Sequence, residues 1–198
     1  MDAEAGRSNR YTTLDLVVMA VIGVVFAILN NVAGVFFQTI TASMGPVLAQ
    51  IFAIFGIAPC LAMFIVRKPG AAIITFFLNS VVQALAGNPA GVGALGWGVL
   101  EGGGTELVFL ATRYRNFGPV IMFVSAGVGA ITGNLWTYTL FGLWGTVASQ
   151  LLVFLAANVF GFITFGVESG LVAYGIGLVL QRSGLLSGFK GGQLAEAT

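Results

Sequence analysis

Two carboxylates, Glu101 and Glu106, lie inside a glycine-rich apolar stretch, residues 96–113. Placing a charged side chain at the centre of a bilayer costs about 2.5–3.5 kcal/mol on insertion scales. A carboxylate in such a stretch therefore normally faces a pocket, a path or a charged partner. The chemistry that this pattern predicts is the binding of a cation, and the rest of the chain must supply the elements that position the carboxylate.

The composition is that of an integral membrane protein built from helices. Of the 198 residues, 58% are hydrophobic and only 8% are charged, whereas a soluble domain carries about 25% charged residues. The apolar runs are far longer than the strands of about 10 residues that form an outer-membrane barrel. We therefore predict an all-α, multi-pass protein of the cell (plasma) membrane, surrounded by the lipid bilayer.

Several classes of function are excluded by the residues that the chain lacks. It has no histidine, which removes the Ser-His-Asp triad, the histidine-ligated zinc proteases and histidine-ligated haem. The single cysteine, Cys60, is expected to be a small buried apolar residue. A net charge of +1 gives a nucleic-acid role no electrostatic basis. We expect no catalytic residue, no metal site and no cofactor of the chain's own.

Six apolar segments predict six transmembrane helices, within a membrane domain of residues 14–182. Their expected ranges are 14–37, 45–66, 70–86, 92–112 and 119–140, with a sixth inside 146–180. Residues 1–13 form a polar cytoplasmic tail, and the Gly/Ser-rich residues 183–198 are expected to be flexible. With six helices all basic residues fall on one side, which places both termini in the cytoplasm. These residues are Arg7, Arg10, Arg67, Lys68, Arg113, Arg115, Arg182 and Lys190.

Depth separates the three glutamates of the predicted membrane domain. At 1.5 Å per residue, Glu101 lies roughly 18 Å from the cytoplasmic end of its helix, and Glu168 roughly 21 Å from the end of the sixth helix. Glu106 is on the same helix as Glu101 and lies only about 10 Å from the cytoplasmic end of that helix. Its side chain projects roughly 140° round the helix from that of Glu101. We therefore expect Glu106 to pair with an arginine or with helix ends near the cytoplasm, and Glu101 to serve a different site.

Polar and aromatic residues share helix faces at the outer depth of the bilayer, because residues four apart lie on one face. Such pairs are Trp97 with Glu101, Asn79 with Gln83, Asn134 with Tyr138, and Thr164 with Glu168. They predict one pocket that opens outward. Its candidate residues are Asn30, Asn79, Gln83, Asn88, Trp97, Glu101, Asn134, Tyr138 and Glu168. The alternative for each amide is that it bridges two helices as a packing contact.

A carboxylate beside aromatic rings suits a cationic, aromatic small molecule. A cation gains from contact with a ring face, and an ion pair at about 4 Å is worth roughly 4 kcal/mol at an effective dielectric constant of 20. The candidate pocket contains no basic residue. The sequence therefore disfavours an anionic substrate.

Three strings resemble one family of transport proteins. They are RKPGAA at residues 67–72, GNPAG at residues 87–91 and EGGGTELVFLATR at residues 101–113. Together they resemble the YkoE-type substrate-binding S component of energy-coupling factor (ECF) vitamin transporters. The resemblance implies a six-helix S component that captures thiamine or its hydroxymethylpyrimidine precursor. It also implies a transmembrane T component and two ATPase subunits, which consume the ATP.

Small residues on the first helix are implied to contact the T component. Here Gly23 and Ala27 are four residues apart, and Ala20 lies near the same face. Two other functions remain open. One is a stand-alone secondary transporter, with Glu101, Glu106 and Glu168 as a proton relay. The other, an intramembrane enzyme, has the least support. The choice between thiamine and hydroxymethylpyrimidine also stays open.

Overall fold

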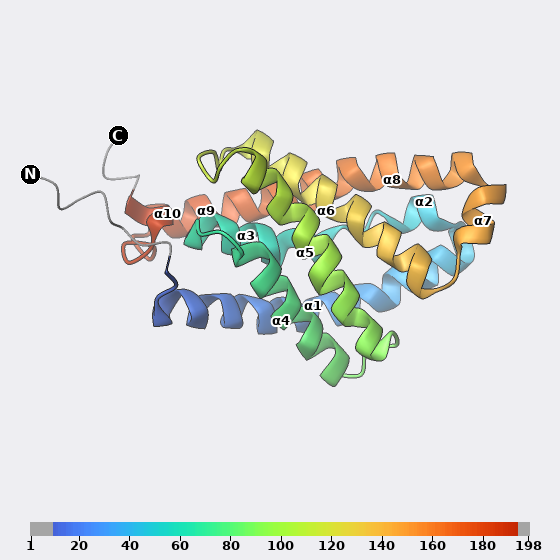
Figure 1. The fold of residues 1–198 in the computed structure, drawn as a ribbon, viewed down its shortest axis with the longest axis horizontal. Helices are drawn as coiled ribbons and strands as arrows, with labels where there is room; N and C mark the ends of the chain where they lie inside the picture. Colours follow the sequence, from blue (N-terminus) through green and yellow to red (C-terminus); the bar gives the residue numbers. More distant parts are fainter. Residues whose placement is uncertain (1–9, 194–198) are drawn as a thin grey trace, which may run out of the picture.

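The structure is a computed structural model that describes residues 10–193, and the secondary structure in that range is entirely helical (Figure 1). The elements are α1 (Thr13–Met44), α2 (Pro46–Ala49), η1 (Ile54–Gly56), α3 (Ile57–Val66), α4 (Ala71–Leu85), η2 (Gly91–Gly93), α5 (Ala94–Ala111), α6 (Pro119–Leu140), α7 (Trp144–Ser149), α8 (Leu151–Phe165), η3 (Gly166–Leu171), α9 (Val172–Arg182) and α10 (Lys190–Gln193).

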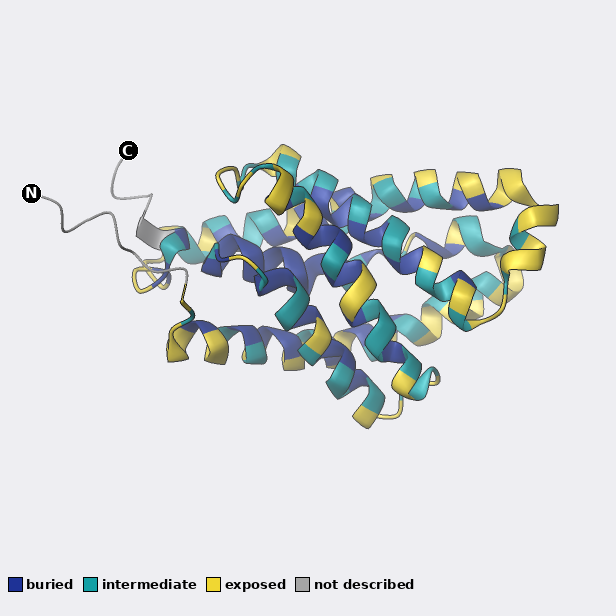
Figure 2. Cartoon of the chain, in the orientation of Figure 1, coloured by how far each residue is buried: buried dark blue, intermediate teal, exposed yellow. Residues whose placement is uncertain are grey.

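The helix α3 forms the centre of an elongated bundle. Helix α1 runs along one side, α8 and α9 along the opposite side, and α4, α5 and α6 lie beside one another across the face seen in Figure 1. Every residue of α3 is buried (Figure 2). A helix that is apolar on all sides is expected in such a position, and the sequence IAPCLAMFIV has no polar face to expose.

In the described part of the chain, four helical segments are long and apolar enough to cross a membrane: Thr13–Met44, Pro46–Val66, Pro119–Leu140 and Leu151–Arg182. Ala71–Leu85 is a shorter apolar helix. The apolar side chains exposed on α1, such as Val21 at 56% and Ile28 at 60%, suit contact with lipid. The predicted multi-pass helical protein is therefore confirmed. Helix α1 extends to Met44 rather than to residue 37.

Close packing of α5 against α4 depends on two glycines four residues apart. A Cβ atom on Gly98 would lie 2.8 Å from the Cα atom of Phe77, and one on Gly102 would lie 3.2 Å from the Cα atom of Ile73. Small residues at this spacing let two helix backbones approach each other in a membrane. This contact fixes α5, and with it the two glutamates, relative to the centre of the bundle.

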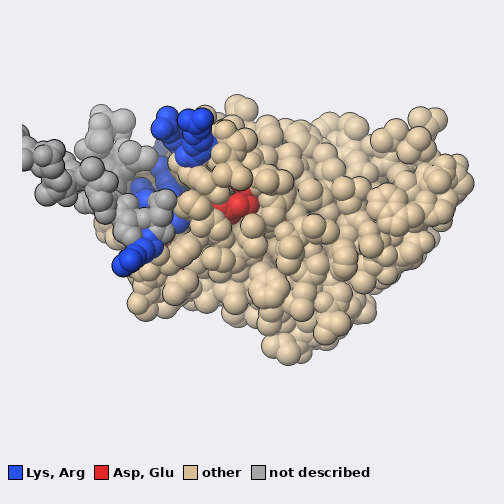
Figure 3. Space-filling model, in the orientation of Figure 1, with Lys and Arg blue, Asp and Glu red and all other residues tan. Residues whose placement is uncertain are grey.

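The lysine and arginine side chains visible in Figure 3 gather at one end of the molecule, the end where α1 begins in Figure 1. There, Thr12 and Asp15 form a capping box that begins α1, and the Asp15 carboxylate also pairs with the buried ammonium of Lys68. Tyr11 donates a hydrogen bond to the carbonyl oxygen of Pro69 at 2.7 Å. These contacts join the start of α1 to the connection between α3 and α4.

The chain after α9 packs against the bundle. Leu186 is 4% exposed and Phe189 is 7% exposed, because both pack into the core. The expected flexibility of residues 183–198 stays a prediction. Residues 194–198, and residues 1–9 of the predicted polar tail, lie outside the described part of the chain.

The small residues of α1 face inward. Ala27 is fully buried, and a Cβ atom on Gly23 would lie 3.1 Å from the carbonyl oxygen of Thr75 and 3.3 Å from the backbone nitrogen of Asn79. Ala20 is half-buried. Gly23 therefore serves the packing of α1 on α4, and the contact of Ala20, Gly23 and Ala27 with a T component stays a prediction.

Candidate functional site

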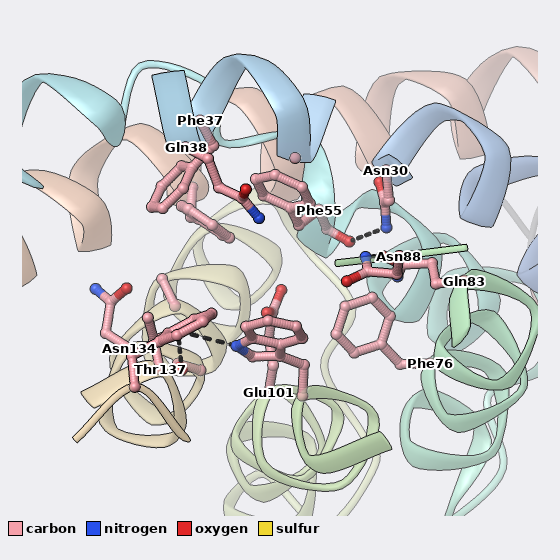
Figure 4. Close-up of a pocket in the computed structure, with 16 residues that line it drawn as sticks. Asn30, Phe37, Gln38, Phe55, Phe76, Gln83, Asn88, Glu101, Asn134 and Thr137 are labelled. Carbon is pink, nitrogen blue, oxygen red and sulfur yellow. Dashed lines mark hydrogen bonds between the residues drawn. The ribbon is translucent and has the colours of Figure 1, made fainter. Parts of the chain in front are cut away.

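A pocket of about 110 Å³ lies between α1, η1, α4, α5, α6 and α8 (Figure 4). Rings form much of its wall. They belong to Phe37, Phe55, Phe76, Trp97, Phe141 and Phe165. Between the rings lie amide side chains, one threonine hydroxyl and one carboxylate. The pocket is therefore apolar with a few convergent polar groups, which is the usual composition of a small-molecule site.

Among the described residues that line the pocket, Glu101 is the only charged one. Its side chain points from α5 into the space between α1, α4 and α6 (Figure 4). The residue is only 6% exposed, and its Oε1 atom has no hydrogen-bond partner within residues 10–193. A Cβ atom on Gly133 of α6 would lie 2.8 Å from Oε2, so glycine at this position leaves room for the carboxylate. A buried carboxylate without a partner is costly unless a cation or donor joins it.

A chain of hydrogen-bonded amides forms the wall beside α1 and α4. Asn30 donates to the Oδ1 atom of Asn79 at 3.3 Å, and Gln83 donates to the same atom at 2.6 Å. Asn88, from the loop after α4, donates to the Oε1 atom of Gln83 at 3.1 Å. The Oδ1 atom of Asn30 is buried and has no partner. These hydrogen bonds hold the amide side chains in place and leave the Oδ1 atom of Asn30 available as an acceptor.

Trp97 is held in place from α6. Its indole nitrogen donates to the Thr137 hydroxyl at 2.9 Å, and that hydroxyl donates to the Gly133 carbonyl oxygen at 3.1 Å. The ring lies 6.5 Å from the Phe141 ring, measured between centroids. Trp97 and Glu101 lie one helical turn apart on α5, as their spacing predicts. A rigid ring and a carboxylate therefore face one cavity.

The other two glutamates serve backbone groups. The Glu106 carboxylate accepts hydrogen bonds from the backbone nitrogens of Gly70 at 2.7 Å and Ala72 at 3.0 Å, where α4 begins. The expectation that Glu106 pairs with a helix end is confirmed. Glu168, in the π-helical segment η3, accepts from the backbone nitrogen of Ala53 at 3.2 Å. Neither residue lines the pocket.

The structure brings together six of the nine predicted pocket residues. Those that line the cavity are Asn30, Gln83, Asn88, Trp97, Glu101 and Asn134. Asn79 lies behind Asn30 and Gln83 and donates to the carbonyl oxygen of Gly23 at 3.1 Å. Tyr138 accepts from Asn158 at 2.9 Å, and Asn134 donates to the same Asn158 side chain at 3.3 Å. Asn79, Tyr138 and Glu168 therefore support neighbouring residues instead of lining the pocket.

Sequence reasoning missed most of the aromatic wall. Phe37 and Gln38 lie where the first helix was expected to end, and Phe141 lies just beyond the fifth helix. The other phenylalanines, Phe55, Phe76 and Phe165, stand in apolar runs in which a ring gives no contrast. Thr137 was detectable, because it lies three residues after Asn134 on a helix face already known to be polar.

The arrangement favours recognition rather than chemistry. It offers one negative charge, several ring faces and amide groups that both donate and accept. Within residues 10–193 no three His, Cys, Asp or Glu side chains gather as a metal site. Cys60 is buried away from the pocket, with its sulfur 3.7 Å from the Ser125 hydroxyl.

Comparisons with known proteins agree with this picture of a transport protein. Residues 14–132 match the family described as "ABC-type cobalt transport system, permease component". A protein of Bacillus subtilis (strain 168), provisionally named HMP/thiamine permease protein YkoE, is 32% identical over 183 residues, which cover 90% of this chain and 89% of that protein. A crystal structure of an S component of an ECF transporter superposes with a TM-score of 0.86 at 25% identity, and covers 95% of this chain and 94% of that one.

The relatives are transport components rather than enzymes. The match to the family extends over more than half of the chain, and the relative from Bacillus subtilis is similar over nearly all of it. The chain belongs to the YkoE-type family of ECF transporter S components.

Proposed function

We propose that this S component captures thiamine or its hydroxymethylpyrimidine precursor in the pocket around Glu101. The observation that carries the proposal is the buried, unpartnered carboxylate oxygen of Glu101 in a cavity walled by rings. Thiamine combines a fixed positive charge with aromatic rings, so it supplies both the missing counter-charge and the stacking surface. The name of the relative from Bacillus subtilis points to the same two ligands.

The direction of transport follows from the charge distribution. The described lysines and arginines gather at the end where α1 begins and α9 ends (Figures 1 and 3), and the pocket is lined by residues of α1, α5 and α6 farther along the bundle. Under the positive-inside rule that end faces the cytoplasm. We infer six membrane-spanning segments with both termini inside, and a pocket that opens to the outside, as capture for import requires.

The chain supplies binding and leaves the energy to partners. The proposed partners are a T component and two ATPase subunits that hydrolyse ATP, and the likeness to an ECF S component supports this assembly. The proton-relay alternative loses two of its three members, because Glu106 and Glu168 are bound to backbone nitrogens. A lone Glu101 offers no chain of carboxylates for a proton to follow.

Cobalt, which the family description names, fits the pocket poorly. A divalent transition metal prefers several nitrogen, oxygen or sulfur ligands in a regular geometry. The pocket offers one carboxylate and neutral amides, and the described residues contain no cluster of His, Cys, Asp and Glu that would complete a site. The organic cation therefore remains the better proposal.

Calorimetry on the purified protein tests the proposal. Thiamine, hydroxymethylpyrimidine and cobalt(II) chloride are titrated separately into protein in detergent or nanodiscs. We expect saturable 1:1 binding of at least one organic ligand, with a Kd of about 1 µM or tighter, and no saturable heat from cobalt. Saturable cobalt binding with no heat from either organic ligand would overturn the proposal.

A further inference from the structure

A second cavity lies at the other end of the bundle and is not part of the ligand pocket. It has a volume of about 280 Å³. Its walls come from the end of α3, the loop between α5 and α6, and α9, which Figure 1 places at the end that carries the termini. Two arginines line it, Arg67 and Arg115, and no acidic residue of the described range 10–193 does.

Arg67 is fixed in this cavity by contacts that leave its charge without a counter-charge. Its Nε atom donates to the Phe64 carbonyl oxygen at 3.1 Å, and its guanidinium lies 5.1 Å from the centre of the Phe64 ring and 4.7 Å from that of the Phe117 ring. In residues 10–193 the only ion pair joins Lys68 to Asp15, so Arg67 and Arg115 have no carboxylate partner there. Burial lowers the pKa of Arg67, as expected for a cation removed from water without an anion beside it.

The remaining wall adds one further donor. Gln181 on α9 contributes an amide. Gly118, which precedes α6, also lines the cavity, and its backbone nitrogen donates to the Oδ1 atom of Asn116 at 2.9 Å. The cavity thus presents two guanidiniums and an amide to one space.

The position of the cavity beside the ends of the membrane spans points to a lipid as the source of the anion. Three candidate membrane spans end or begin beside it, at Val66, Pro119 and Arg182. Next to it, the apolar side chains of Val120 and Val179 are 71% and 67% exposed. A molecule that binds there has its charged group at the bilayer surface and its apolar part along α6 and α9. Basic pockets between transmembrane helices on the cytoplasmic side are suited to anionic lipid head groups.

We propose that this cavity binds the phosphate of an anionic phospholipid, with Arg67 and Arg115 as the phosphate ligands. Arg67 is pre-positioned between two rings, whereas Arg115 is exposed and free to close over the head group. A zwitterionic lipid would place a choline cation near two guanidiniums, which disfavours it. The site goes beyond vitamin capture, because it lies at the opposite end from Glu101.

Native mass spectrometry tests this site with short-chain phosphatidylglycerol and phosphatidylcholine titrated into delipidated protein. Arg115→Gln removes one charge that lines the cavity, while Arg113→Gln removes one from an exposed residue nearby in sequence that does not line it. We expect wild-type protein to prefer phosphatidylglycerol, Arg115→Gln to weaken its binding about fivefold, and Arg113→Gln to change it less than twofold. Because Arg115 is exposed, its substitution leaves the core intact.

Three results would overturn the proposal. Unchanged phosphatidylglycerol binding in Arg115→Gln removes the residue from the site. Equal weakening by Arg113→Gln shows a diffuse attraction between charges instead of a site. Competition by inorganic phosphate at concentrations similar to those of the lipid assigns the cavity to a free anion. The double variant Arg67→Gln/Arg115→Gln, if its melting temperature is unchanged, is expected to abolish the preference for phosphatidylglycerol over phosphatidylcholine.

Discussion

Glu101 and Glu106 lie five residues apart on the same helix, and each is 6% exposed. Glu106 accepts two hydrogen bonds from the start of α4, whereas the Oε1 atom of Glu101 has no partner. Equal burial therefore accompanies opposite roles. A buried carboxylate that is fully hydrogen-bonded holds two helices together, and one that is left unpartnered beside ring faces marks the place of a ligand.

The largest effect should come from removing the charge of the structural glutamate. Glu106→Gln leaves one oxygen to serve two backbone nitrogens, and hydrogen bonds to a charged group are worth about 1.5–3 kcal/mol each. We expect the free energy of unfolding to fall by about 3 kcal/mol. Glu101→Gln is the matched control, and it should leave the stability unchanged or raised, because it removes an unpartnered charge. Unfolding curves in mixed micelles measure the free energy of unfolding of both variants. An equal decrease in the two would contradict the assignment of a structural role to Glu106 and a ligand-binding role to Glu101.

A smaller effect is expected where α1 meets the amide wall of the pocket. In Gly23→Leu the new side chain would push against the backbone of α4 at Thr75 and Asn79, and overpacking of this kind costs about 2 kcal/mol. Since Asn79 donates to the Gly23 carbonyl oxygen, ligand binding should weaken as well. Val24→Leu, on the exposed side of the same helix, is the control and should change neither. If Gly23→Leu keeps its normal stability but loses uptake, the result would instead support a contact between this face of α1 and the T component.

The smallest effect concerns the orientation of the ring beside Glu101. Thr137→Val removes the hydroxyl that accepts the hydrogen bond from Trp97, which is worth about 1 kcal/mol. We expect vitamin affinity to fall about fivefold, with a reduced change in tryptophan fluorescence on binding. Thr139→Val, an exposed site on the same helix, serves as the control. If the two variants bind alike, the Trp97 ring is not part of the recognition surface.

Much of the site was accessible from sequence because polar residues stand out in an apolar chain. Trp97, Glu101 and Gln83 were found from spacing alone, and each lines the pocket. Asn79 shares its helix face with Gln83, but it lies one turn further into the bundle, where its side chain accepts a hydrogen bond from Gln83 and does not line the pocket. Which of two residues on one face reaches the pocket depends on how closely the neighbouring helices pack. The spacing of residues along a single helix does not predict this.

Other features had no readable signal. The rings of Phe55 and Phe165 are apolar residues among apolar residues, so nothing marked them as pocket walls. The spacing of Gly23 and Ala27 is the same whether a helix packs on its own subunit or on a partner, so the sequence does not reveal that Gly23 faces the backbone of α4. The packing of the segment after α9 was hidden by its Gly/Ser content, because the apolar residues that join it to the core, Leu186 and Phe189, stand among glycines and serines in the sequence.

The most direct test of the central claim compares two ligands on one variant. Glu101→Gln keeps the shape of the side chain and removes its charge, so a ligand with a fixed positive charge should suffer more than an uncharged one. By calorimetry, we expect thiamine binding to weaken at least tenfold, about 1.4 kcal/mol, and hydroxymethylpyrimidine binding to weaken by clearly less. Unchanged affinity for thiamine would contradict the assignment of Glu101 as the partner of a bound cation.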